Sequence, residues 1–242
     1  MLTDKIVLVT GAASGIGAAV SARLAAAGAR VYRADLAKLE GASSLGTGSQ
    51  PNGVVLDVRD EAAWSAAIDT ILAADTRLDA LVNCVGVAAG SPLPDTTLAE
   101  WQRVIGINLD GAFLATKYGI RTMRATGGAI VHVGSASGIR PAPGAAAYST
   151  SKAALRMLVQ TAAKECRQAG WAIRINAVSP AGVKTPMWST MPFFQDLVRQ
   201  HGSEDAAFAA MAQAGGGTFI EPDAVAQHIT GVELPVDDGY VL

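Results

Sequence analysis

The sequence predicts an α/β protein, a doubly wound domain with a parallel sheet of about seven strands flanked by helices. Two observations support this fold class. Short runs of apolar and β-branched residues alternate with longer helical patterns along all 242 residues. The first run, Lys5–Thr10, leads directly into a glycine-rich turn and an alanine-rich helix. The chain contains no repeat, linker or shift in composition, so we expect residues 1–242 to form a single domain.

The composition excludes several classes of protein. Half of the residues are hydrophobic and 17% are charged, which excludes a mainly disordered chain. A net charge of -2 gives no electrostatic basis for binding nucleic acid. No apolar run is long enough to span a membrane, and the first residues are typical of a strand rather than of a signal sequence. Cys84 and Cys166 are far apart and the three histidines lack ligand-like spacing, so we expect no disulfide, no metal and a cytoplasmic location.

The turn after the first strand predicts a nucleotide cofactor. Gly11, Gly15 and Gly17 follow the pattern Gly-x-x-x-Gly-x-Gly and open a helix that ends near Gly28. Gly11 permits a tight turn, while Gly15 and Gly17 let the backbone approach a pyrophosphate at the helix N-terminus. The pattern alone would also fit an ordinary tight turn. Its place between a strand and a helix favours a Rossmann-like dinucleotide-binding domain.

The end of the second strand indicates which dinucleotide binds. This strand, Arg30–Ala34, is followed by Asp35, whose carboxylate can accept hydrogen bonds from a ribose 2′-hydroxyl and would repel a 2′-phosphate. Leu36 stands where a basic residue would favour the phosphate. NAD is therefore favoured over NADP, although Arg33 and Lys38 are basic residues nearby. The alternative for Asp35 is a helix cap or a loop carboxylate.

The remaining elements continue the alternation. Further strands are predicted at Val54–Leu56, Leu81–Val82, Gly128–Gly134, Ala172–Val178 and Gly231–Val236, helices at Asp60–Ala74, Leu98–Met123 and Tyr148–Ala169, and a surface connection at Glu40–Asn52. Asn108 lies inside a predicted helix, where an asparagine indicates a specific partner, a local kink or a solvent-facing position. His132 alternates with apolar neighbours and is predicted to be a core residue. Cys84 is predicted to be a packing residue rather than a reactive thiol.

Tyr148 and Lys152 form the candidate catalytic pair. They are four residues apart and therefore share one face of a helix. A free tyrosine has a pKa near ~10, and a nearby ammonium favours the phenolate and lowers that pKa. The pair can thus act as a general acid and base. An accidental surface pair is the alternative for this spacing alone, but its neighbours in the sequence favour catalysis, including Ser135 just past the end of a strand.

The segment 186–217 is rich in methionine, phenylalanine and tryptophan and lacks the alternation of a strand. Such residues could fill ordinary core. Because the segment is inserted between the carboxyl end of the sheet and the last strand, it could equally form a mobile apolar lid over a substrate. The glycines at 215–217 would then be a loop or hinge at its end.

Taken together, these motifs resemble the short-chain dehydrogenase/reductase family of the small, single-domain type. The resemblance covers nearly the whole chain and rests on TGAASGIG, NCVG, Asn108, Ser135, YSTSK, SPAGVKTPM and GVELPVDDG. It implies a seven-stranded parallel sheet and a homotetramer that assembles through the long helices. Three features depart from the family pattern. NCVG replaces Asn-Asn-Ala-Gly, Pro180 is followed by Ala181 before Gly182, and a stretch of roughly three helical turns is missing before the last strand.

The resemblance assigns roles to four residues. Tyr148 would exchange a proton with the substrate oxygen, and Lys152 would lower the tyrosine pKa and bond the nicotinamide ribose. Ser135 would hydrogen-bond the substrate oxygen, and Asn108 would hold a water molecule behind the lysine. A hydride would pass between the substrate carbon and the nicotinamide.

The resemblance also implies a set of binding residues. Those expected at NAD are Gly11, Ser14, Gly15, Ile16, Gly17, Asp35, Leu36, Asp57, Val58, Asn83, Gly86, Tyr148, Lys152, Pro180, Val183 and Thr185. Those expected at the substrate are Ser135, Met187, Trp188 and Met191.

The chain is most similar to bacterial hydroxysteroid dehydrogenases of the 3β/17β type and to alicyclic alcohol dehydrogenases. The expected activity is therefore NAD-dependent oxidation of a small-molecule secondary alcohol, or reduction of the ketone, with a bulky and apolar substrate. An epimerase or dehydratase on the same cofactor fold and a non-catalytic NAD-sensing or interaction protein are the alternatives.

Overall fold

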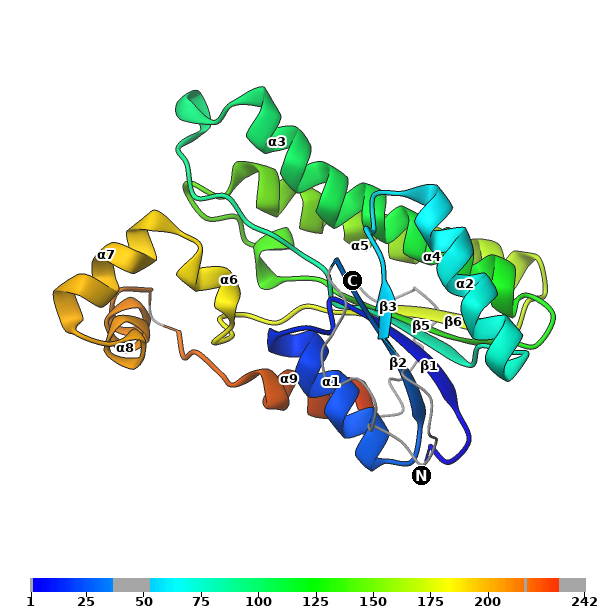
Figure 1. Cartoon of the computed structure of the whole chain (residues 1–242). Coiled ribbons are helices and arrows are strands. Elements are labelled where there is room, and N and C mark those ends of the chain that lie inside the picture. Colours follow the sequence, from blue (N-terminus) through cyan, green and yellow to red (C-terminus); the bar gives the residue numbers. More distant parts are fainter. Residues whose placement is uncertain (1, 37–52, 216, 231–242) are drawn as a thin grey trace.

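The computed structural model describes residues 2–36, 53–215 and 217–230. Within these residues, six parallel strands form one sheet in the order β3-β2-β1-β4-β5-β6 (Figure 1). The strands are β1 (Ile6–Thr10), β2 (Arg30–Asp35), β3 (Gly53–Val55), β4 (Ala80–Asn83), β5 (Gly128–Val133) and β6 (Ile173–Val178). The predicted strand Gly231–Val236 and the predicted connection Glu40–Asn52 lie outside the described residues. The order reverses between β1 and β4, and such a reversal creates a ligand-binding crevice at the carboxyl ends of the strands.

Helices cover both faces of the sheet (Figure 1). The helices α1 (Gly15–Ala26) and α9 (Pro222–Thr230) lie on one face, and α2 (Glu61–Asp75), α4 (Gly111–Met123) and α5 (Ala146–Gln168) lie on the other. The alternation along β1 explains the two layers. Ile6 and Leu8 belong to the core beneath α2, α4 and α5, whereas Val7 and Val9 belong to the core beneath α1. The predicted doubly wound α/β domain is confirmed.

The predicted long helix at Leu98–Met123 is interrupted. It consists of α3 (Leu98–Ile105), one wider π-helical stretch, η3 (Gly106–Asp110), and α4. Asn108 lies in the wide stretch and is 1% exposed, which excludes a solvent-facing position. Its side chain bonds a loop and a neighbouring helix, and π-bulges are frequent where a helix must present such a residue. Two short 3₁₀ turns, η2 (Leu93–Asp95) and η4 (Ala136–Gly138), complete this half of the chain.

Three helices project beyond the carboxyl end of the sheet: α6 (Pro186–Ser189), α7 (Pro192–His201) and α8 (Glu204–Gly215) (Figure 1). We call them the three-helix segment. They have an apolar core of their own around Phe194, which is fully buried, and Phe208. The chain enters and leaves the segment through a short parallel bridge between Val183 and Ile220. Gly216 of the predicted glycine hinge lies outside the described residues.

The bridge explains one departure from the family pattern. A Cβ atom at Gly182 would lie 2.8 Å from the ring of Phe219, so a residue with a side chain would not fit there without a shift. Ile220 donates its backbone N–H to the Gly182 carbonyl at 2.9 Å. The glycine is therefore needed at position 182, one place later than in the usual Pro-Gly loop. At this position the chain that enters the three-helix segment meets the chain that leaves it.

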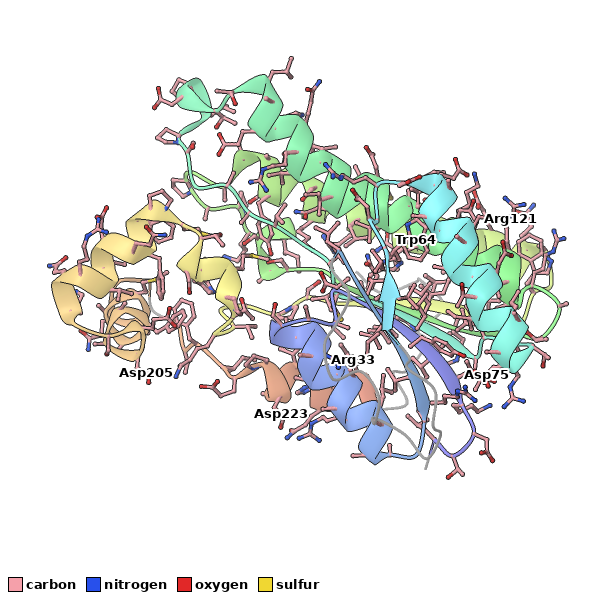
Figure 2. All side chains as sticks on the ribbon, viewed as in Figure 1. Arg33, Trp64, Asp75, Arg121, Asp205 and Asp223 are labelled. Carbon is pink, nitrogen blue, oxygen red and sulfur yellow. The ribbon has the colours of Figure 1, made fainter. Side chains whose placement is uncertain are left out.

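The helix α9 packs against α1, with Val225 and Ala226 buried and Asp223 paired with Arg23 (Figure 2). It has nine residues, and the chain beyond it lies outside the described part. No helix among the described residues is long and apolar enough to cross a membrane. In the same part of the chain, no group of acidic, histidine or cysteine side chains could hold a metal ion.

Candidate active site

The structure brings the four candidate catalytic residues to the carboxyl end of the sheet. Tyr148 and Lys152 lie in the first turns of α5, Ser135 follows β5, and Asn108 lies in η3. The Lys152 Nζ atom is 5.8 Å from the centre of the Tyr148 ring and donates a hydrogen bond to the Val133 carbonyl at 2.8 Å. Ser135 and Lys152 are both buried. Residues that are far apart in the sequence thus share one enclosed polar site.

Burial shifts the pKa of both members of the pair. It raises the pKa of Tyr148, while a hydrogen bond with Ser135 acts in the opposite direction. Burial also lowers the pKa of Lys152 to about 8. The net shift of the Tyr148 pKa is upward, because burial outweighs the hydrogen bond with Ser135.

Asn108 holds the site together through its side-chain amide. Its Oδ1 accepts the Val87 N–H at 2.8 Å, and its Nδ2 donates to the Val87 carbonyl at 2.9 Å. The same Nδ2 donates to Ser151 Oγ at 3.0 Å, and that hydroxyl donates to the Tyr148 carbonyl at 2.7 Å. Sequence reasoning missed Ser151, whose position between the tyrosine and the lysine was the available signal.

The glycine turn fits a dinucleotide. Gly11 has a φ of +67°, and a Cβ atom there would lie 3.1 Å from the Cys84 carbonyl carbon. A Cβ atom on Gly17 would lie 2.0 Å from the Gly11 oxygen, so only glycine allows this approach of helix and turn. Ser14 is the N-cap of α1 but makes no side-chain capping bond, and Ile16 lies in the first turn. The free N–H groups at this helix end suit a pyrophosphate.

Asp35 lies at the end of β2, beside the glycine turn. Its Oδ2 accepts the Ala13 N–H at 2.9 Å, and its Oδ1 accepts the Leu36 N–H at 2.8 Å. The Leu36 side chain is 65% exposed. The carboxylate is thus fixed by backbone donors next to the turn rather than capping a distant helix.

Asp57 and Val58 follow β3. Asp57 forms an ion pair with Arg59, whose hydrogen bonds hold the pKa of that carboxyl below its usual range. The Val58 side chain is buried, and its carbonyl accepts the indole N–H of Trp64 at 3.0 Å (Figure 2). Any contact of Val58 with a cofactor is therefore restricted to its backbone N–H.

The Asn83 side chain belongs to a buried polar chain across the sheet. Its Oδ1 accepts the Thr10 hydroxyl at 2.7 Å, and its Nδ2 lies 3.2 Å from Nδ1 of His132. The other ring nitrogen of His132 lies 3.0 Å from the Thr116 hydroxyl, which donates to the Ala112 carbonyl. Burial lowers the pKa of His132 to about 3. His132 is a satisfied core residue, as predicted, and only the backbone of Asn83 can face a cofactor.

Loops from β4 and β6 close the crevice. A Cβ atom on Gly86 would lie 3.4 Å from Lys152 Nζ, and one on Gly15 would lie 3.2 Å from Thr185 Cγ2. Pro180 accepts a backbone hydrogen bond from Ala136, which ties the β6 loop to the turn that carries Ser135. Burial raises the pKa of Cys84 to about 12, in agreement with a packing role.

Of the four predicted substrate residues, Met187, Trp188 and Met191 lie in the three-helix segment, whereas Ser135 follows β5. Trp188 donates its indole N–H to the Val183 carbonyl at 2.8 Å. Its ring contacts four phenylalanines: Phe193, Phe194, Phe208 and Phe219. Met187 packs on the same cluster, whereas Met191 is buried inside it. Phe193 of the predicted lid segment is 41% exposed and lies 3.5 Å from the position of a Cβ on Gly90 in the β4 loop.

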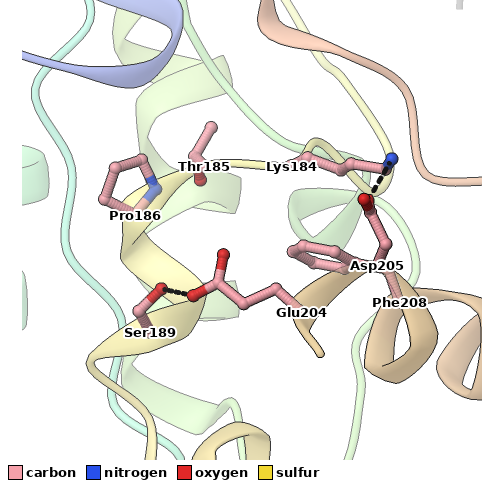
Figure 3. A pocket seen from close by; sticks show the side chains of 7 residues that line it. All are labelled: Lys184, Thr185, Pro186, Ser189, Glu204, Asp205 and Phe208. Carbon is pink, nitrogen blue, oxygen red and sulfur yellow. Dashed lines mark hydrogen bonds and ion pairs between the residues drawn. The ribbon is translucent and has the colours of Figure 1, made fainter. Parts of the chain in front are cut away.

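A pocket of about 440 Å³ lies at the base of the three-helix segment (Figure 3). It is lined by Lys184, Thr185, Pro186, Ser189, Glu204, Asp205 and Phe208. Lys184 pairs with Asp205 at 2.9 Å, and the Ser189 hydroxyl donates to Glu204 at 2.8 Å (Figure 3). The pocket contains Thr185 of the predicted cofactor set but none of the four candidate catalytic residues.

A family model described as short chain dehydrogenase matches residues 5–193. The chain belongs to the short-chain dehydrogenase family. The family inferred from the motifs is therefore confirmed. A short-chain dehydrogenase is an oxidoreductase that uses a nicotinamide cofactor, which agrees with the glycine turn.

The relatives of this short-chain dehydrogenase include alicyclic and steroid enzymes. It is 38% identical to the cyclopentanol dehydrogenase of Comamonas sp. (strain NCIMB 9872), with 99% of this chain and 98% of the relative covered. It is 36% identical to a 3-beta-hydroxysteroid dehydrogenase of Comamonas testosteroni, over 77% of this chain and 74% of the relative. An NADP-dependent (R)-specific alcohol dehydrogenase of Lentilactobacillus kefiri is 30% identical, over 99% of this chain and 97% of the relative.

Among solved structures, the ligand-free aldohexose dehydrogenase of Thermoplasma acidophilum superposes with a TM-score of 0.79 at 26% identity. The match covers 94% of this chain and 86% of the other. The sheet order and the helical layers are therefore those of a known dehydrogenase fold.

Proposed function

We propose that this short-chain dehydrogenase transfers a hydride between NAD(H) and a bulky, apolar secondary alcohol or ketone. The observation that carries the proposal is the position of Tyr148, Lys152 and Ser135 at the carboxyl end of the sheet, beside the glycine turn. Ligands of doubly wound sheets bind in this crevice. The alicyclic and steroid relatives support a secondary alcohol of that kind.

The residues of the chain handle the proton. In alcohol oxidation, Tyr148 Oη takes the hydroxyl proton while the carbinol carbon loses a hydride, and reduction reverses both transfers. The nicotinamide supplies the acceptor or donor of the hydride when it is bound. Ser135 holds the substrate oxygen next to the tyrosine, and the Lys152 cation favours the phenolate. Asn108 orients this end of α5 through Ser151.

NAD is the proposed cofactor because of Asp35. Its carboxylate is held by two backbone N–H groups beside the glycine turn, where it would accept hydrogen bonds from a 2′-hydroxyl and repel a 2′-phosphate. Asp57, the backbone of Val58 and the loop at Gly86 would line the adenosine half. The loop from Pro180 to Thr185 would hold the nicotinamide half.

We further propose that the three-helix segment is the lid over the substrate. It carries its own apolar core, is joined through a short stem, and reaches the β4 loop through Phe193 and Gly90. An apolar ring system would be covered by Phe193, Met187 and Trp188 from this side. Met191 would act indirectly, by filling the lid core.

The proposed assembly is a homotetramer in the cytoplasm. Phe113 on α4 is 49% exposed and Met157 on α5 is 63% exposed, so the two long helices carry apolar side chains that a second copy could cover. Cys84 and Cys166 are free thiols, which supports a reducing compartment. Sedimentation of the purified protein measures the number of subunits directly.

The test of the activity follows the absorbance of reduced nicotinamide with NAD and NADP in parallel, against a panel of alicyclic and steroid alcohols. Turnover with NAD should fall by about 100-fold or more in Tyr148→Phe, because proton transfer is lost. Ser149→Ala is the matched control, since the Ser149 hydroxyl is buried and has no hydrogen-bond partner among the residues that the structure describes. Wild-type turnover in Tyr148→Phe would refute the assignment. NAD binding without turnover of any substrate would favour the non-catalytic NAD-sensing protein.

A further inference from the structure

Trp188 is bonded twice to the loop that is expected to hold the nicotinamide. Its indole N–H donates to the Val183 carbonyl at 2.8 Å, and its backbone N–H donates to the Thr185 carbonyl at 3.2 Å. Val183 and Thr185 are two of the residues predicted at NAD, and they lie just before α6. A residue of the three-helix segment thus fixes two carbonyl groups of this loop.

The Val183 carbonyl points away from the chain that leaves the three-helix segment. In the bridge with Ile220, Lys184 donates its N–H to the Ile220 carbonyl at 2.9 Å, and the Gly182 carbonyl accepts the Ile220 N–H at 2.9 Å. Carbonyl groups alternate between the two edges of an extended chain, so the Val183 carbonyl lies on the edge opposite Ile220. The indole uses one of its two lone pairs. The Val183 oxygen can therefore accept a second hydrogen bond from a ligand.

The same loop runs beside the glycine turn. A Cβ atom on Gly15 would lie 3.2 Å from Thr185 Cγ2. Thr185 is two residues beyond Val183, which is a distance of roughly 7 Å in an extended chain. The Val183 oxygen is therefore within reach of a dinucleotide whose pyrophosphate binds at the N-terminus of α1. The carboxamide is the part of the nicotinamide that can donate a hydrogen bond to such an oxygen.

The indole of Trp188 is held in place by aromatic contacts. Its ring centre lies 5.4 Å from that of Phe219, on the chain that leaves the segment. It lies 6.1–6.3 Å from the ring centres of Phe193, Phe194 and Phe208, on α7 and α8. Because α6 is only four residues long, these rings rather than the helix fix the direction of the indole N–H. The donor at the Val183 carbonyl is therefore set by the core of the three-helix segment.

We propose that Trp188 is a positioning residue for the nicotinamide. Its indole N–H holds the Val183 carbonyl in the direction from which that oxygen accepts the amide N–H of the cofactor's carboxamide. The inference rests on the proposed function in one respect, that the loop from Pro180 to Thr185 holds the nicotinamide half. It deepens that function because it gives the three-helix segment a task in the cofactor site, besides covering the substrate.

The test measures binding rather than turnover. NADH and ADP-ribose share the adenosine, both phosphates and the second ribose, and only NADH carries the nicotinamide. Calorimetric titration of both ligands therefore isolates the nicotinamide, and wild type should bind NADH more tightly. Trp188→Phe keeps an aromatic ring without the N–H. It should reduce the ratio of the ADP-ribose to the NADH dissociation constant by about threefold to tenfold, the factor that one hydrogen bond supplies, with ADP-ribose binding unchanged.

Two comparisons identify the hydrogen bond as the cause. The reduced 3-acetylpyridine analogue of NADH carries a methyl ketone in place of the carboxamide and cannot donate to a carbonyl. Trp188→Phe should change its dissociation constant by less than about twofold, whereas a general loosening of the loop would weaken both dinucleotides. Phe208→Leu is the matched control, because it removes one ring beside Trp188 and leaves the indole N–H in place. This variant should keep the wild-type ratio.

A further variant guards against loss of fold. Replacing the Trp188 side chain by that of β-(3-benzothienyl)alanine keeps the shape of the indole and exchanges only its N–H for sulfur. It should reproduce the effect of Trp188→Phe. Melting temperatures measured beside each titration separate a loss of binding from a loss of structure.

Three results would overturn the inference. The first is an unchanged ratio in both variants at position 188. The second is a higher ratio, which would mean that the indole competes with the carboxamide for the Val183 oxygen. The third is an equal loss for NADH and for the acetylpyridine analogue. Failure of the proposed function has other signatures. A wild type that binds NADH no more tightly than ADP-ribose would refute the nicotinamide loop and the inference with it, whereas a Trp188-dependent ratio without turnover of any alcohol would refute the activity alone.

Discussion

We expect acid to destabilise this protein in part through one buried histidine. His132 lies between Asn83 and Thr116, and its pKa is lowered to about 3 by burial. An unfolded histidine has a pKa of about 6.5. Between these two values the unfolded chain binds more protons than the folded one, so stability falls as the pH falls through this range. The stability that depends on a neutral His132 is fully present above pH ~6.5.

The magnitude follows from the two pKa values. At a pH of about 5 the unfolded histidine is about 97% protonated while the folded one stays neutral, which costs about 2 kcal/mol of unfolding free energy. Carboxylates titrate in the same range, so the comparison needs a variant without the imidazole. His132→Gln keeps a polar side chain but cannot take up the proton. The wild type should lose about 2 kcal/mol more than this variant between neutral pH and pH ~5.

The assay is urea unfolding at both pH values, followed by tryptophan fluorescence at one fixed protein concentration. His228→Gln is the matched control. His228 is an exposed histidine on α9 whose Nδ1 atom lies 2.8 Å from the Ala224 carbonyl oxygen. Equal loss of stability in wild type and His132→Gln would refute the reasoning, since it would mean that His132 does not remain neutral in the folded protein.

Two further predictions concern the candidate active site and the proposed lid. The kcat/KM for ketone reduction should fall above pH ~8, because the Tyr148–Lys152 pair then loses a proton from a lysine whose pKa is lowered to about 8. Lys152→Arg should move this fall to higher pH, and an unchanged profile would count against it. Phe193→Ala should raise the KM for a bulky alcohol by about tenfold with little change in melting temperature, because its ring is 41% exposed. Phe194→Ala, which opens the buried lid core, should instead cost about 3–5 kcal/mol of stability, and similar melting temperatures for the two variants would contradict this.

Features of the fold that follow from local sequence patterns could be predicted, whereas features that depend on contacts between distant residues could not. The alternation of Ile6, Val7, Leu8 and Val9 is a property of the strand itself, so the sequence predicts a strand buried on both faces. The wide turn at Asn108 is different. It depends on Val87, which is 21 residues away and becomes a neighbour only when the β4 loop folds over the helix. The sequence could therefore indicate a kink but not its geometry.

The same distinction holds in the candidate site. The helical spacing of Tyr148 and Lys152 places them together whatever surrounds them. Their pKa shifts depend on burial, which only the folded chain creates, and burial raises the pKa of Tyr148 and lowers that of Lys152. Asn83 was expected near the cofactor, but its side chain is committed to a chain of hydrogen bonds that only the assembled sheet creates.

The separate core of the three-helix segment has a consequence for the proposed range of substrates. The buried residues around Phe194 and Phe208 belong to neither of the two cores that hold the helices on the sheet. The contacts of the three-helix segment with the body include the bridge between Val183 and Ile220, Phe193 beside Gly90, and Ala88 of the β4 loop. Asp35 and the turn it binds are packed by β2 and α1 instead. Under the proposed function, side chains of the three-helix segment can therefore change to admit different ring systems while Asp35 and the glycine turn keep their geometry. The similarity to a cyclopentanol dehydrogenase and to a hydroxysteroid dehydrogenase supports this proposal.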